Sequence, residues 1–182
     1  MMKWKVIEST YLHKEPWLTI RKDKCELPNG NIIPSFYVNE YSEWANAFGL
    51  TKDGKVVMVK QYRHGIESVE TELPGGVIEE GEDVREGVER EMLEETGYRF
   101  EKFEYLGKIS ANPSTTNNFM HMFLATGGEK VAEQELDHEE DVEVLLMSID
   151  EVKQLVKENK MMQSLHVNCI LYALLRLGKI SF

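Results

Sequence analysis

The sequence is poor in cysteine and contains no long apolar segment. Only Cys25 and Cys169 occur among its 182 residues. Two cysteines are too few for a disulfide framework, and without a CxxC pair they offer no zinc site. No apolar run approaches the length of a membrane-spanning helix, and the first residues hold no stretch typical of a signal peptide. We therefore expect a cytoplasmic protein with no membrane partner.

Positive charge is also scarce. The chain has 21 Lys and Arg against 32 Asp and Glu, which gives a net charge of −11. Such a chain has no general electrostatic attraction for DNA or RNA, so we expect no nucleic-acid partner. An acidic protein that handles phosphates needs a cation to bridge the like charges. Hydrophobic residues make up 42% of the chain, which is enough for a core of its own.

The first third of the chain is rich in β-forming residues. Strands are predicted over 17–21, 32–38, 44–50 and 55–62. Asn29-Gly30 and Asp53-Gly54 are typical hairpin turns between these strands. The continuous apolar run at 56–59 predicts a strand that is covered on both faces.

Helices and strands alternate in the rest of the chain. A glycine-rich loop at 73–77 precedes a predicted helix over 83–96, which ends at Gly97. A capping-box pattern at 148–151 opens a helix to about residue 159, and 161–177 predicts a buried terminal helix. Further strands are predicted at 105–110, 121–125 and 143–147.

The predicted helix over 83–96 carries carboxylates at an unusual place. At about 100° per residue, one apolar stripe contains Val84, Val88 and Met92. Glu91 and Glu95 lie along the edge of this stripe, with Glu94 near them, whereas a solvated acidic face would lie opposite. Arg90 alone cannot neutralise three carboxylates. A divalent cation with oxygen ligands can, and Mg²⁺ is the natural choice.

The spacing of the residues in this region matches a known motif. Seven positions fit the pattern G-x5-E-x7-R-E-U-x-E-E-x-G-U, where U is apolar: Gly76, Glu82, Arg90, Glu91, Glu94, Glu95 and Gly97. This is the Nudix box, and the chain resembles the Nudix hydrolases. Met92 fits the first apolar position, while Tyr98 replaces the usual aliphatic residue at the second. The resemblance implies an α/β fold, an α/β/α sandwich around a mixed sheet, with an antiparallel β extension at the N-terminus.

The resemblance also implies a chemistry. Nudix enzymes cleave a nucleoside diphosphate derivative by attack of water on phosphorus, with Mg²⁺, or Mn²⁺ in its place, as the cofactor. The metal ligands are implied to be Glu91, Glu95 and Glu94, with the backbone carbonyl of Gly75. Arg90, which orients the glutamates, and Glu94 count among the catalytic residues, and Glu82 supports them.

The general base is implied to be a glutamate on a loop before a late strand. The loop at 136–142 precedes the predicted strand at 143–147 and contains Glu139 and Glu140. Glu140 is preferred because of its offset from that strand. The alternative is that this loop is simply an acidic, solvated surface.

Other segments resemble the ADP-ribose pyrophosphatases, also called ADP-sugar diphosphatases. Val59-Lys-Gln-Tyr-Arg63 and Glu72-Leu-Pro-Gly-Gly76 match a Q-Y-R strand followed by an E-L-P-x-G loop, and Pro113 stands sixteen residues after Gly97. Substrate contacts are implied for Arg63, Gly76 and Pro113. The alternatives are that Arg63 pairs with an acid and that Pro113 is an ordinary loop proline.

The subgroup implies hydrolysis of ADP-ribose or a related ADP-sugar, a small nucleotide-sugar, to AMP and a sugar phosphate. It also implies a homodimer, in which residues 1–42 supply dimer contacts and part of the nucleotide pocket, and residues 43–182 form the hydrolase domain. The residue that stacks on adenine stays open among Trp17, Phe36, Tyr37 and Trp44. Two other functions are weighed: hydrolysis of a dinucleoside polyphosphate or damaged nucleotide, and regulation by binding ADP-ribose without cleaving it.

Overall fold

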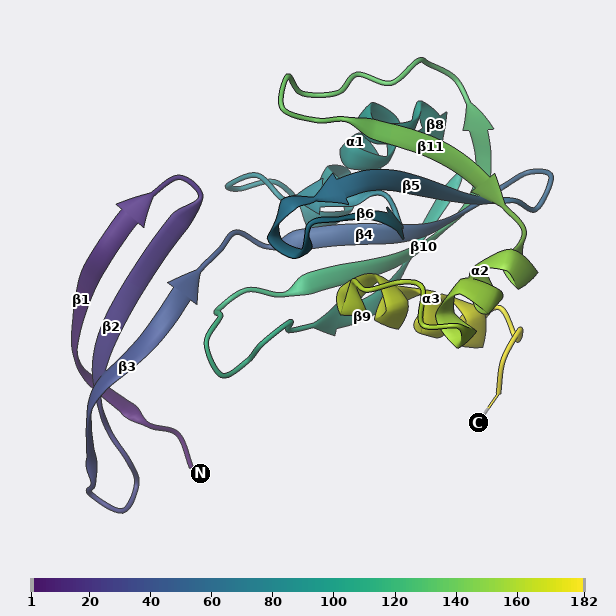
Figure 1. Cartoon of the computed structure of the whole chain (residues 1–182). Helices are drawn as coiled ribbons and strands as arrows, with labels where there is room; N and C mark the ends of the chain where they lie inside the picture. The colour runs from purple at the N-terminus through teal and green to yellow at the C-terminus, as the bar shows by residue number, and fades with distance from the viewer. Residues whose placement is uncertain (1, 182) are drawn as a thin grey trace. The chain divides into compact units, whose positions relative to one another are not determined.

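The computed structural model describes residues 2–181 and divides into two compact units (Figure 1). Within these residues, one unit contains 2–42 and Ser110–Phe119, and the other contains Glu43–Ile109 and 120–181. None of the helices within residues 2–181 is long and apolar enough to cross a bilayer.

The first unit is a three-stranded antiparallel sheet. Its strands, in spatial order, are β1 (Lys5–Glu15), β2 (Leu18–Glu26) and β3 (Ile32–Glu40). The 110–119 segment is tied to β3, because the N–H of Asn39 donates to Thr115 O at 2.7 Å. The sequence did not predict β1. All of its residues are exposed, so its apolar side chains follow no one-sided alternation that would mark a strand.

The second unit contains a mixed sheet of eight strands. The strands are β4 (Trp44–Thr51), β5 (Val56–Arg63), β6 (Ser68–Glu72), β7 (Gly75–Val77), β8 (Tyr98–Arg99), β9 (Lys102–Ile109), β10 (Met120–Lys130) and β11 (Val142–Met147). The central order is β11-β5-β4-β10-β8. Strand β10 runs parallel to β4, and β4 and β11 are antiparallel to β5. A single turn of 3₁₀ helix, η1 (His64–Ile66), connects β5 to β6.

Helices cover both faces of this sheet (Figure 1). Helix α1 (Val84–Thr96) packs on one face through Val88 and Met92. Helices α2 (Ile149–Lys157) and α3 (Ser164–Arg176) pack on the other, where Val152 and Ile170 join the larger core. The fold is therefore the α/β/α sandwich that the sequence predicts. The four apolar residues that open β5 are fully buried, as expected for a strand covered on both faces.

The ends of the helices follow from local chemistry. Asp83 Oδ1 accepts the N–H of Arg85 at the start of α1, and Gly97 ends the helix with a φ of 73°. The capping box of Ser148 and Glu151 is present at the start of α2. Two expectations were wrong in detail. Residues 161–163 lie before α3 rather than in it, and part of the 73–77 loop forms strand β7 beside β4.

Candidate active site

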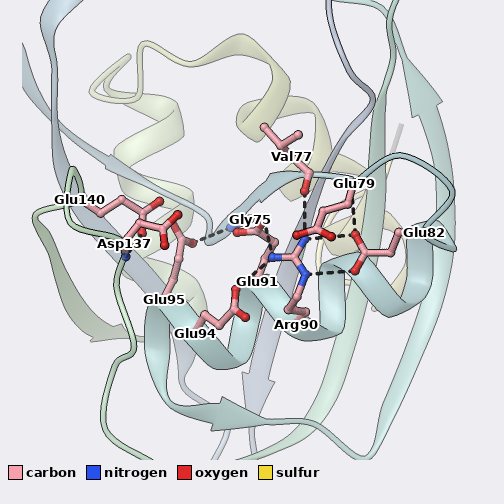
Figure 2. A network of polar contacts seen from close by, with 10 residues as sticks. All are labelled: Gly75, Val77, Glu79, Glu82, Arg90, Glu91, Glu94, Glu95, Asp137 and Glu140. Atoms are coloured by element: carbon pink, nitrogen blue, oxygen red, sulfur yellow. Dashed lines mark hydrogen bonds and ion pairs between the residues drawn. The ribbon is translucent and has the colours of Figure 1, made fainter. Parts of the chain in front are cut away.

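Arg90 lies at the centre of the polar network on α1 (Figure 2). Its Nε and Nη2 donate to the two carboxylate oxygens of Glu82 at 3.0 and 3.1 Å, and Nη2 also donates to Val77 O at 3.1 Å. Its Nη1 donates to Glu91 and Glu94, each at 3.0 Å. The Arg90 guanidinium also lowers the pKa of Glu82. One fork of donors thus fixes three glutamates of the motif relative to β7.

Glu95 is buried and Glu91 is half-buried at the edge of the core. Glu95 is 5% exposed, and its Oε2 accepts the N–H of Gly75 at 2.8 Å. Burial raises the pKa of Glu91 to about 7 and that of Glu95 to about 8, and the charge of Glu140 acts in the same direction on both. Carboxylates in this state are short of positive charge.

Two glycines let the 73–77 loop approach these carboxylates. A Cβ atom at Gly76 would lie 2.4 Å from an oxygen of Glu91. A Cβ at Gly75, whose φ is +145°, would lie 2.2 Å from Ala45 O. The absence of a side chain lets Gly76 lie against Glu91 and lets Gly75 pack closely on strand β4.

The donor set fits a hard divalent cation. Glu91, Glu94 and Glu95 supply only oxygen atoms, and the pKa values of Glu91 and Glu95 are raised although Arg90 contacts Glu91 and the Arg63 charge acts on Glu95. Within residues 2–181 no three Asp, Glu, His or Cys side chains form a ready-made metal cluster. Instead, Arg90 contacts Glu91 and Glu94, and the Gly75 N–H donates to Glu95. When these carboxylates bind one cation together, the cation must replace some of these hydrogen bonds.

The loop between β10 and β11 brings Glu140 to the same site (Figure 2). Glu140 Oε2 accepts the N–H of Asp137 at 3.1 Å, and its own N–H donates to Asp137 O at 3.0 Å. Its charge contributes to the raised pKa values of Glu91 and Glu95, so the three carboxylates are close in space. Glu139 is exposed in the same loop.

Arg63 forms an ion pair with Glu72, which is the alternative considered for it above. Its Nε lies 3.1 and 3.2 Å from the oxygens of Glu72, a side chain that is 1% exposed. The side chain of Arg63 remains 40% exposed and borders a cavity of about 350 Å³. Its charge also acts on Glu95. The pair therefore leaves the guanidinium available to a ligand close to the glutamates.

Other predicted residues lie in the first unit. Pro113 is exposed in the 110–119 segment. Trp17 and Tyr37 are exposed on the three-stranded sheet, and Phe36 packs edge-on against Trp4, with ring centroids 5.6 Å apart. Trp44, in the second unit, packs against the core under α3.

The sequence did not predict four contacts of the site. They involve Glu72, Asp137, Gln134 and His166. No strand is predicted at 68–72, so the burial of Glu72 and its need for a cationic partner are not evident from the sequence. The other three act through backbone groups, which carry no signature in the sequence.

Comparison with known proteins identifies the family. The Nudix domain matches residues 45–165, and the nucleoside diphosphate sugar hydrolase N-terminal domain matches residues 4–39. The chain belongs to the Nudix hydrolase family, whose members generally require a divalent metal ion.

Several relatives match most of the chain. A methanol dehydrogenase activator from Bacillus methanolicus is 32% identical over 92% of this chain and 91% of its own length. An ADP-ribose pyrophosphatase from Bacillus subtilis is also 32% identical, over 85% of this chain and 83% of its own length. The crystal structure of an ADP compounds hydrolase superposes with a TM-score of 0.85 at 19% identity, covering 99% of this chain and 98% of the other. That likeness supports the fold.

Proposed function

We propose that this chain hydrolyses the diphosphate of ADP-ribose or a related ADP-sugar, with Mg²⁺ or Mn²⁺, to give AMP and a sugar phosphate. One observation carries the proposal: the buried Glu95 and the half-buried Glu91 have raised pKa values and lie against the backbone of Gly75 and Gly76. Such a site needs a cation, and a cation in an acidic protein attracts a diphosphate. The ADP-ribose pyrophosphatase relative and the Q-Y-R strand support the choice of substrate.

The cation would be held by Glu91, Glu94, Glu95 and the carbonyl of Gly75. When bound, it supplies charge neutralisation for the diphosphate and lowers the pKa of water. Arg90 would hold Glu91 and Glu94 next to each other on α1, since it contacts both through one nitrogen.

Glu140 would act as the general base. It accepts a proton from water as the new bond from oxygen to phosphorus forms, and the bond from phosphorus to the bridging oxygen breaks. The two negative charges of the leaving phosphate group are carried by its oxygen atoms. Arg63, held by Glu72 and with its charge acting on Glu95, would contact a phosphate or the terminal sugar.

The three-stranded sheet supports a homodimer. Every residue of β1 is exposed, including Val6, Ile7, Tyr11 and Leu12. Exposed apolar side chains such as these are common at interfaces, and we assign them to contacts with a second copy of the chain in the cytoplasm. Residues 1–42 would then supply dimer contacts and, through one of their aromatic side chains, part of the nucleotide pocket. Analytical sedimentation of the Leu12→Lys variant tests this assignment. The control is Val131→Lys, because Val131 is an exposed residue of the other unit. Only Leu12→Lys should lower the measured mass toward that of a monomer.

A substrate panel tests the reaction itself. AMP release should be strongest from ADP-ribose, should require Mg²⁺ or Mn²⁺, and should stop with a chelator. Glu95→Gln should lose most turnover, whereas Glu89→Gln, on the exposed side of α1 beside Arg85, should keep it. Preference for a dinucleoside polyphosphate or a damaged nucleotide would contradict the substrate. Binding of ADP-ribose without turnover would contradict the enzymatic function and favour a regulator.

A further inference from the structure

The loop at 131–141 caps the C-terminal end of α1. The last carbonyl groups of an α-helix have no partner within the helix. Here the N–H of Glu135 donates to Glu94 O at 2.9 Å, and the N–H of Val131 donates to Gly97 O at 2.9 Å. The loop that carries the proposed general base is therefore built onto the end of the helix that carries the glutamates.

Gln134 completes this cap and extends it to the sheet. Its Nε2 donates to Glu95 O at 2.8 Å and to Val142 O at 2.9 Å. Both acceptors are carbonyl oxygens, so the side-chain atom facing them must be the amide nitrogen, and both of its N–H groups are used. One carboxamide thus joins the last turn of α1 to the first residue of β11.

These bonds close a short segment of chain on itself. Residues 135–141 leave Gln134 and return to the sheet at Val142, so the Gln134 amide fixes both ends of the segment. Glu140 lies within it, and its carboxylate is held on the N–H of Asp137. A loop with fixed ends has fewer conformations to lose when its side chain must meet a substrate.

Gly97 makes the close approach possible. A Cβ atom at this position would lie 2.2 Å from Ala132 O. The final glycine of the motif thus ends α1 and also leaves room for the loop that carries Glu140.

We propose that Gln134 is a positioning residue, whose carboxamide holds Glu140 opposite Glu91 and Glu95 and so governs the rate of hydrolysis rather than the binding of substrate or metal. This role rests on the proposed function, since Gln134 acts through the proposed base. The glutamates themselves stay on α1 whether or not the amide is present, which separates the two effects.

Gln134→Met tests the role, because methionine keeps the length of the side chain and removes both donors. The matched control is Gln154→Met, whose amide bonds Glu158 on α2. We expect kcat for AMP release from ADP-ribose to fall about ten- to a hundredfold in Gln134→Met. KM and the affinity for Mn²⁺, measured by paramagnetic resonance, should change by less than about twofold. Amide hydrogen exchange in 135–141 should accelerate, while α1 stays protected.

A double-mutant cycle identifies the path of the effect. In a Glu140→Gln background, Gln134→Met should lower kcat little further, because the residue to be positioned is already inactive. Independent, multiplying losses would overturn the proposal. So would an unchanged kcat, an unchanged exchange rate, or losses of kcat, KM and metal affinity together.

Failure of the proposed function gives a different pattern. The wild-type protein would then release no AMP from ADP-ribose, and the catalytic role of Gln134 would fall with it. Exchange in 135–141 would still differ between Gln134→Met and Gln154→Met, because the hydrogen bonds do not depend on the reaction.

Discussion

The ring nitrogen Nδ1 of His166 accepts a hydrogen bond from the backbone N–H of Leu73 at 3.1 Å. This bond links helix α3 to the loop that, two residues later, donates the Gly75 N–H to Glu95. His166 is buried, and burial lowers its pKa to about 4. The imidazole is therefore neutral at physiological pH, as an acceptor at Nδ1 requires.

This bond predicts a loss of stability in acid. In the unfolded chain His166 has its ordinary pKa of 6.5, whereas in the folded chain its pKa is about 4. The contribution of His166 should be complete above pH 6.5 and should decline as the pH falls toward 4. Urea unfolding across this range should show the decline in the wild type relative to His166→Asn, which keeps an acceptor but does not titrate. A constant difference across the range would contradict the prediction.

The acidic pair on α1 predicts the opposite slope in the metal-free protein. In the folded state the pKa of Glu91 is raised to about 7 and that of Glu95 to about 8. Both lie above the ordinary pKa of glutamate, about 4.3. The chelated protein should therefore lose stability as the pH rises from about 4.3 through 8. Mg²⁺ should stabilise the protein more at pH 8 than at pH 5. Thermal unfolding with Mg²⁺ and with chelator checks this, and an equal effect at both pH values would contradict it.

Arg90 predicts a cost for a substitution that keeps the charge. Arg90→Lys retains one cation but loses the fork that contacts Glu82, Glu91 and Glu94. We expect turnover to fall about ten- to a hundredfold. Arg85→Lys is the control on the same helix, where Arg85 pairs with the exposed Glu89. Similar activities for the two variants would show that the fork is dispensable.

Gly97 predicts a large effect on stability. Gly97→Ala combines a φ of +73° with a Cβ that would lie 2.2 Å from Ala132 O. Gly54→Ala has a similar φ of +80° but meets nothing within 4 Å. Chemical denaturation should show a loss of about 1 kcal/mol for Gly54→Ala from backbone strain alone. The loss for Gly97→Ala should exceed it clearly, because backbone must also shift. Equal losses would mean that the loop yields easily.

The sequence predicts helix α1 and its cluster of glutamates around Arg90 because the contacts there depend on residue type. Only carboxylates, one arginine and glycines serve at these positions, and a single helix fixes their spacing. Pattern and structure agree for the same reason at the α2 capping box, where Ser148 and Glu151 contact each other's backbone within one turn.

The residues that support the site from a distance escape such patterns. Gln134 acts on the carbonyl of Glu95, 39 residues away, and His166 on the N–H of Leu73, 93 residues away. Almost every residue has a backbone donor and acceptor. The sequence therefore does not indicate which backbone group a side chain such as Gln134 or His166 will contact. Strand β1 escapes prediction for a different reason, since its apolar residues are exposed along the whole strand and show no buried face.

The chain passes between the two units more than once, and this limits where the protein can be cut into independent fragments. The first unit needs residues 110–119, which leave the large sheet after β9 and return to it at β10. In that segment Asn117 and Asn118 bond the backbone of Tyr41 and Ser42. A fragment that begins at residue 43 would carry this segment without its partners. The N-terminal strands are therefore not a detachable module, and recombination or proteolysis near residue 42 would leave both fragments incomplete.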